Sequence, residues 1–171
     1  MTDTKQSDHA LIDSITQGDI HAFESLYDRY ASKVLKRCYF ICLHTEQAHD
    51  LMQEVWIKVF LNLHTFKKEA AFSTWLYRLT TNHCLNYLKS KIHSEKLMQT
   101  IEQEESKSID YSVSADVKNI LSKLSIEDRT ILAMKFMGEY TYEEISAACG
   151  MGVSAAKMKV SRLLTKLREE V

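Results

Sequence analysis

Apolar residues recur every three or four positions along most of the chain, which is the spacing of an amphipathic helix. One long stripe follows Asp19, a residue suited to begin a helix, and extends from Phe23 to Cys42. Further stripes occupy residues 45–63 and 73–91, and a short one precedes them at 11–15. The 45–63 stripe comprises Ala48, Leu51, Met52, Val55, Trp56, Val59 and Phe60. These patterns predict a helical N-terminal domain over residues 1–93.

The periodicity breaks at residues 94–112, which are acidic, serine-rich and poor in apolar side chains, as in a flexible linker. Residues 113–171 then carry four short helical patterns. Each follows a residue that often caps helices: Ser114, Ser125, Thr141 and Ser154. Proline is absent from the 171 residues and glycine occurs 4 times, so signals for turns and sheets are scarce. The predicted fold is all-α, with two small helical domains joined by a flexible acidic linker.

The last two patterns are typical of a helix-turn-helix. Thr141 and Glu144 have the spacing of a capping box, Gly150 falls at the turn, and a longer basic helix follows. Its predicted buried stripe contains Ala156, Val160, Leu163, Leu164 and Leu167. The exposed face would carry Lys157, Met158, Ser161 and Arg162, at a spacing that fits the DNA major groove. An ordinary amphipathic helix with a solvated basic face would show the same pattern.

Charge is nearly balanced overall, with 22 basic and 23 acidic residues, but it is segregated along the chain. Residues 65–93 carry five bases against one acid, and residues 153–171 carry five bases against two acids. Residues 1–30 and 94–116 each carry six acids against two bases. Two separate basic segments indicate two contacts with one polyanion, because phosphate charge is neutralised locally.

The first basic segment interleaves its cations with the aromatic residues Phe66, Phe72, Trp75, Tyr77 and Tyr87. Aromatic faces beside cations suit single-stranded DNA, whose bases stack while its phosphates follow the positive charge. Helical spacing places Trp75, Arg78, Asn82, Asn86 and Lys89 on one face. The alternative is that these aromatics belong to the core, as we expect for Phe72.

The preceding helix has a polar face made by Asp50, Gln53, Glu54 and Lys58, opposite its apolar stripe. Such a face is usually only solvated, but it could also bind the basic surface of a protein partner.

Several other features bear on the class of protein. Cys38, Cys42, Cys84 and Cys149 are scattered and read as four buried thiols, so neither a metal nor a cofactor is expected. The polar N-terminus lacks a secretory signal, and no apolar run is long enough to cross a membrane, which predicts a cytoplasmic protein.

Taken together, these motifs resemble the bacterial RNA polymerase sigma factors of the extracytoplasmic-function (ECF) group. The resemblance spans AFESLYDRYASKVL, AHDLMQEVWIKVF, FSTWLYRLTTNHCLNYLKSK and the C-terminal segment from LSIEDRTILAMKF onward. It implies a protein without catalytic activity or small-molecule substrate, whose partners are core RNA polymerase, promoter DNA and an anti-sigma factor.

The resemblance also implies residue roles. Asp50, Gln53 and Glu54 would bind core polymerase, and residues 65–71 would enclose a flipped −10 base. The single-stranded −10 element would be bound by Lys67, Lys68, Trp75, Arg78, Asn82, Asn86 and Lys89. The −35 duplex would be read by Lys157, Met158, Ser161 and Arg162. Met158 stands where family members usually have a small polar residue, so the −35 sequence read is expected to be unusual.

Two other functions compete with this interpretation. A conventional helix-turn-helix repressor or activator would need neither the aromatic and basic surface nor the polar face at Asp50. A hydrolase or metalloenzyme using the seven histidines is disfavoured, because HExxH, GxSxG and P-loop spacings do not occur in the sequence.

Overall fold

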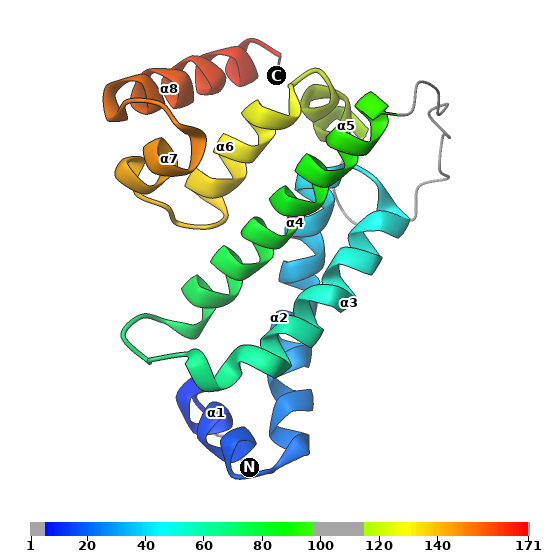
Figure 1. Ribbon diagram of the computed structural model, residues 1–171, viewed down its shortest axis with the longest axis vertical. Helices are drawn as coiled ribbons and strands as arrows, with labels where there is room; N and C mark the ends of the chain where they lie inside the picture. The colour runs from blue at the N-terminus through cyan, green and yellow to red at the C-terminus, as the bar shows by residue number, and fades with distance from the viewer. Residues whose placement is uncertain (1–5, 98–114, 171) are drawn as a thin grey trace.

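A computed structural model describes residues 6–97 and 115–170, and every regular element within these ranges is helical (Figure 1). The N-terminal domain contains α1 (Asp8–Thr16), α2 (Ile20–Cys42), α3 (Thr45–Asn62), the short 3-10 helix η1 (Leu63–Thr65) and α4 (Phe72–Leu97). The C-terminal domain contains α5 (Ala115–Ser122), α6 (Ile126–Phe136), α7 (Tyr142–Cys149) and α8 (Val153–Glu169). The all-α fold with a C-terminal helix-turn-helix is therefore confirmed.

Helices α2, α3 and α4 form the body of the N-terminal domain, and α1 packs against α2 (Figure 1). Asp19 caps α2 by accepting a hydrogen bond from the His21 amide, as its position in the sequence predicts. Helix α4 extends to Leu97, four residues beyond the predicted domain end at 93. The expected linker core and the Ser114 cap lie outside the described residues.

The C-terminal domain is built from short helices with well-defined starts. Ser125 accepts from the Asp128 amide at the start of α6, and Thr141 and Glu144 form a reciprocal capping box at the start of α7. Gly150 takes φ +64° after α7, a backbone conformation that glycine adopts without strain. The predicted Ser154 cap is wrong: α8 begins at Val153, because the Gly152 carbonyl already accepts a hydrogen bond from the Ala156 amide at 2.9 Å, and Ser154 lies in the first turn.

The two domains pack against each other, because α6 contacts both α2 and α4. Figure 1 shows α6 beside α4, with α8 on the outer side of the C-terminal domain. Arg37 of α2 supports this packing: its Nε donates to the Met137 carbonyl at 3.0 Å, and its guanidinium lies 3.2 Å from the centre of the Tyr77 ring. Burial lowers the pKa of Arg37 from its ordinary value.

No helix within the described ranges is long and apolar enough to span a bilayer. The prediction of four buried thiols holds for Cys38 and Cys84, whereas Cys42 and Cys149 are partly exposed.

Candidate functional site

The polar face of α3 is where the periodicity places it. Asp50, Gln53 and Glu54 are exposed on α3, opposite the buried Leu51 and Val55. Carboxylates on an exposed helix are available to a basic partner.

An apolar groove of about 480 Å³ adjoins this face and includes Gln53 in its lining. Its other lining residues are Phe23, Tyr27, Trp56, Ile57, Phe60 and Leu61. Phe60 belongs to the predicted apolar stripe of this helix, but the structure does not bury it. Its side chain is 53% exposed, although its ring makes an edge contact with Phe23 at a centre-to-centre distance of 5.3 Å. The apolar residues Ile57 and Leu61, outside the buried stripe, were the sequence signal for this groove.

His83 of α4 connects this face to the neighbouring helix. Its Nε2 lies 2.7 Å from Glu54 Oε2, and its Nδ1 lies 2.8 Å from Lys58 Nζ. Burial, followed by the nearby Lys58 charge, lowers the pKa of His83. Because an ammonium group can only donate, Nδ1 of the neutral ring accepts from Lys58 and Nε2 donates to Glu54. These contacts of His83 with Glu54 and Lys58 were not predicted from the sequence.

A polar hollow of about 430 Å³ lies between α3 and α4. It brings together four of the predicted −10 residues: Trp75, Arg78, Asn82 and Asn86. Lys58, Asn62, Leu79 and His83 complete the lining. The hollow therefore combines cations, amides and one half-buried indole.

The other predicted −10 residues lie outside this hollow. Lys67 and Lys89 are exposed, and Lys68 forms an ion pair with Asp13 of α1. The hollow's lining contains none of residues 65–71, which were expected to enclose a base.

Of the two interpretations of the aromatic residues in this segment, the structure favours the core for most of them. Phe66, Phe72 and Tyr77 are buried, and Phe72 is only 1% exposed. Trp75 packs on Phe66 and Phe72, with ring centres 5.7 Å from each. These rings are buried because one face of α4 is apolar and packs against α2 and α3.

The basic helix α8 presents its predicted outer face. Lys157, Met158, Ser161 and Arg162 are all exposed on it. Ala156, Val160 and Leu163 are buried beneath, with Leu164 and Leu167 partly buried. Lys159 is held away from this face by ion pairs with Glu127 and Asp128 of α6.

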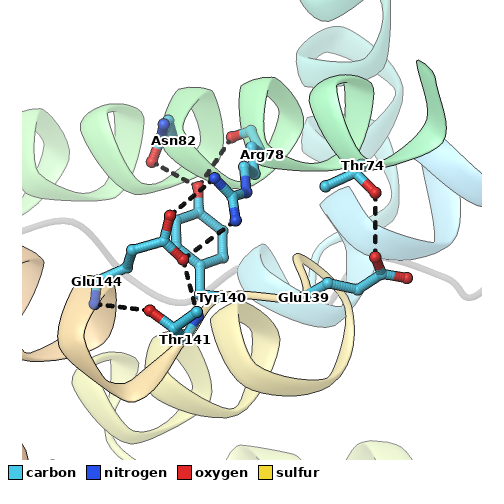
Figure 2. Close-up of polar contacts among 7 residues, drawn as sticks. All are labelled: Thr74, Arg78, Asn82, Glu139, Tyr140, Thr141 and Glu144. Carbon is cyan, nitrogen blue, oxygen red and sulfur yellow. Dashed lines mark hydrogen bonds and ion pairs between the residues drawn. The ribbon is translucent and has the colours of Figure 1, made fainter. Parts of the chain in front are cut away.

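Two residues of the hollow are bound by the C-terminal domain (Figure 2). The guanidinium of Arg78 forms paired contacts with the Glu144 carboxylate, at 2.8 and 3.1 Å. The Tyr140 hydroxyl lies 3.1 Å from Asn82 Oδ1 and 3.3 Å from the Arg78 carbonyl oxygen. We name these four residues, Arg78, Asn82, Tyr140 and Glu144, the interdomain cluster. The contacts of Tyr140 and Glu144 with α4 were not predicted from the sequence.

Two family models match this chain, one in each domain. The family model of sigma-70 region 2 matches residues 26–92, and that of sigma-70 region 4 matches residues 114–167. The chain belongs to the sigma-70 family, in its ECF group. The region 2 match spans most of α2, all of α3 and most of α4, and the region 4 match spans α5–α7 and most of α8.

Curated relatives of this sigma factor are similar along almost their full length. ECF RNA polymerase sigma factor SigW of Bacillus subtilis is 26% identical, with 94% of each chain covered. RNA polymerase sigma-H factor of Pseudomonas aeruginosa is 25% identical, covering 93% of this chain and 91% of that protein. Both relatives are named as RNA polymerase sigma factors.

Solved structures share the fold. CnrH in complex with the cytosolic domain of CnrY aligns with a TM-score of 0.60 at 18% identity, covering 96% of both chains. The sigma factor RpoE in complex with the anti-sigma factor NepR from Bartonella quintana aligns with a TM-score of 0.63 at 19% identity, covering 86% of this chain and 95% of that one.

Proposed function

We propose that this sigma factor binds core RNA polymerase and directs initiation at promoters whose −10 element it reads as a single strand and whose −35 element it reads as duplex. The observation that carries the proposal is the hollow between α3 and α4, where Trp75, Arg78, Asn82 and Asn86 meet.

The hollow suits an unpaired strand for chemical reasons. An asparagine amide offers a donor and an acceptor to an unstacked base edge, and a guanidinium binds phosphate or stacks on a base. Trp75 supplies an aromatic face at the rim, since it is half-buried against Phe66 and Phe72. A duplex would not offer the Watson–Crick edges or the faces of its bases, because these are paired and stacked within it.

Helix α8 suits an intact duplex. Its cations Lys157 and Arg162 are exposed, and the packing of α8 on α6 and α7 leaves that face outward. A single exposed basic helix fits the major groove, where arginine and lysine contact guanine edges and phosphates.

The polymerase-binding surface comprises Asp50, Gln53 and Glu54 together with the adjoining apolar groove. The carboxylates would orient the two proteins and speed their association, and the exposed apolar side chains would supply the area buried in the complex. Ile57 and Phe60 are 60% and 53% exposed, which costs free energy until a partner covers them.

We also propose that an anti-sigma factor restrains the chain. CnrH and RpoE, which share its fold, were solved bound to CnrY and to the anti-sigma factor NepR. The apolar groove beside α3 is the surface that such a protein would cover.

Transcription initiated in vitro by core polymerase with this chain tests the proposal, using Asn86→Ala. Asn86 lines the hollow and is exposed, so its loss should reduce open-complex formation while −35 duplex affinity and folding stay unchanged. Asn119→Ala, an exposed asparagine on α5, is the matched control. Lowered −35 binding with normal initiation from a pre-melted template would refute the assignment of the hollow to single-stranded DNA.

A further inference from the structure

The turn between α6 and α7 has an unusual shape that directs one tyrosine toward α4. A Cβ on Gly138 would lie 2.5 Å from Cε2 of Tyr140, so the absence of a side chain there lets the ring fold back. Glu139 takes φ +56°, in the left-handed region, and the Tyr140 amide donates to the Met134 carbonyl at 3.1 Å. The turn is therefore built to hold Tyr140 in place.

Tyr140 makes contacts of the kind expected of a nucleobase. It is 8% exposed, and its ring centre lies 5.0 Å from the Arg78 guanidinium carbon. Its hydroxyl is shared between Asn82 Oδ1 and the Arg78 carbonyl oxygen (Figure 2). An aromatic ring beside a guanidinium, with a hydrogen bond to an amide, is how single-stranded nucleic acid is commonly bound.

Glu144 makes the contact expected of a phosphate. Two carboxylate oxygens meet two guanidinium nitrogens of Arg78, and arginine binds phosphate with the same paired geometry. A hydrogen bond from the Thr141 amide is the largest cause that lowers the pKa of Glu144, so the carboxylate is ionised at neutral pH.

We propose that residues 138–144 act as an internal mimic of single-stranded DNA, in which Tyr140 stands in for a base and Glu144 for a phosphate. The segment occupies Arg78 and Asn82, two of the residues that line the hollow. This inference rests on the proposed function of the hollow. Single-stranded DNA and residues 138–144 compete for the same side-chain atoms, so the chain with its domains packed together binds the −10 strand weakly.

Residues 138–144 can be displaced by DNA because they leave part of the hydrogen-bonding capacity of Arg78 unused. The Nε of Arg78 is buried and has no hydrogen-bond partner within the described residues. Arg78 and Glu144 remain more than a third exposed, so water screens their attraction. A partner that pulls α6 away from α4 would remove the mimic and expose the hollow for DNA.

The test measures binding of a fluorescein-labelled oligothymidine to the full chain. Glu144→Gln removes the charge facing Arg78 but keeps a residue that completes a capping box, and Tyr140→Phe removes the hydroxyl. The double variant should bind the oligonucleotide about fivefold more tightly or better, because the binding-competent fraction rises. Gly138→Ala should act in the same direction, since its methyl group would displace the Tyr140 ring. Glu143→Gln, an exposed glutamate of the same helix turn, is the matched control and should change nothing.

Adding Asn86→Ala to the double variant separates the possible failures, because Asn86 lines the hollow outside the interdomain cluster. Loss of the gained affinity in this triple variant supports the mimic. Equal affinity of wild type and double variant, with both weakened by Asn86→Ala, overturns the mimic while leaving the proposed function intact. If no variant binds the oligonucleotide although hydrogen exchange shows α4 exposed, the mimic and the proposed single-strand site both fail.

Discussion

His83 of α4 donates a hydrogen bond from Nε2 to the Glu54 carboxylate of α3, and this contact joins the proposed polymerase-binding face to the helix that carries the hollow. The His83 side chain is 10% exposed, whereas that of Glu54 is 56% exposed. The largely buried His83 therefore orients the solvent-exposed Glu54 carboxylate from the protein side.

We expect His83→Ala to weaken binding to core polymerase about three- to tenfold, because Glu54 loses the donor that orients it. Titration of labelled core polymerase measures the affinity, and −35 duplex binding should not change. His64→Ala, an exposed histidine on η1, is the control. Unchanged polymerase affinity in His83→Ala would show that Glu54 needs no support from α4.

The pKa of His83 also predicts a dependence of stability on pH. Burial lowers this pKa below its ordinary value of 6.5, so the unfolded chain binds the proton more readily than the folded chain does. Stability from this group is fully present above about pH 6.5 and is lost as the pH falls toward the folded-state pKa. Thermal unfolding between about pH 7.5 and 5.5 should show a smaller decline for His83→Gln than for wild type; equal slopes would contradict the prediction.

Two phenylalanines provide a matched comparison of core and surface. Phe72→Ala should lower the free energy of unfolding by about 3–5 kcal/mol, because Phe72 is 1% exposed and contacts several rings. Phe60→Ala should cost about 1 kcal/mol or less but weaken polymerase binding, since Phe60 lines the apolar groove. Denaturant unfolding and polymerase titration separate these effects, and a normal polymerase affinity for Phe60→Ala would remove the groove from the interface.

The outer face of α8 is tested by charge reversal. Lys157→Glu with Arg162→Glu should weaken −35 duplex binding about 100-fold or more, while the buried Val160 and Leu163 keep the helix folded. Lys166→Glu, an exposed lysine on another side of α8, should have a smaller effect. Footprinting on a cognate promoter provides the measurement, and undiminished upstream protection by the double variant would exclude this face from recognition.

Local signals in the sequence predict much of this fold. Asp19 and Thr141 begin their helices as expected, because a cap depends on residues within one turn of it. The outward position of Lys157 and Arg162 follows from helical spacing alone. The shared lining of Arg78, Asn82 and Asn86 has the same origin.

Contacts between distant segments could not be predicted in this way. Glu54 and His83 are 29 residues apart, and Tyr140 and Asn82 are 58 apart, so no periodicity connects them. Phe60 has the spacing of a core residue, yet among the described residues it stays 53% exposed and makes an edge contact with Phe23. Which face of an amphipathic helix finds a neighbour depends on how the helices pack, and a single sequence does not state that arrangement.

Glu144 has two roles, and together they allow the two domains to separate without disturbing the start of α7. Its carboxylate receives the Thr141 amide at 2.8 Å as well as the Arg78 guanidinium. When Arg78 departs, the Glu144 carboxylate keeps a charge-assisted hydrogen bond within its own helix turn, so it is not left unpaired and α7 keeps its capping box. The helix-turn-helix can thus leave α4 as a folded unit, and its return requires only that two preformed surfaces meet again.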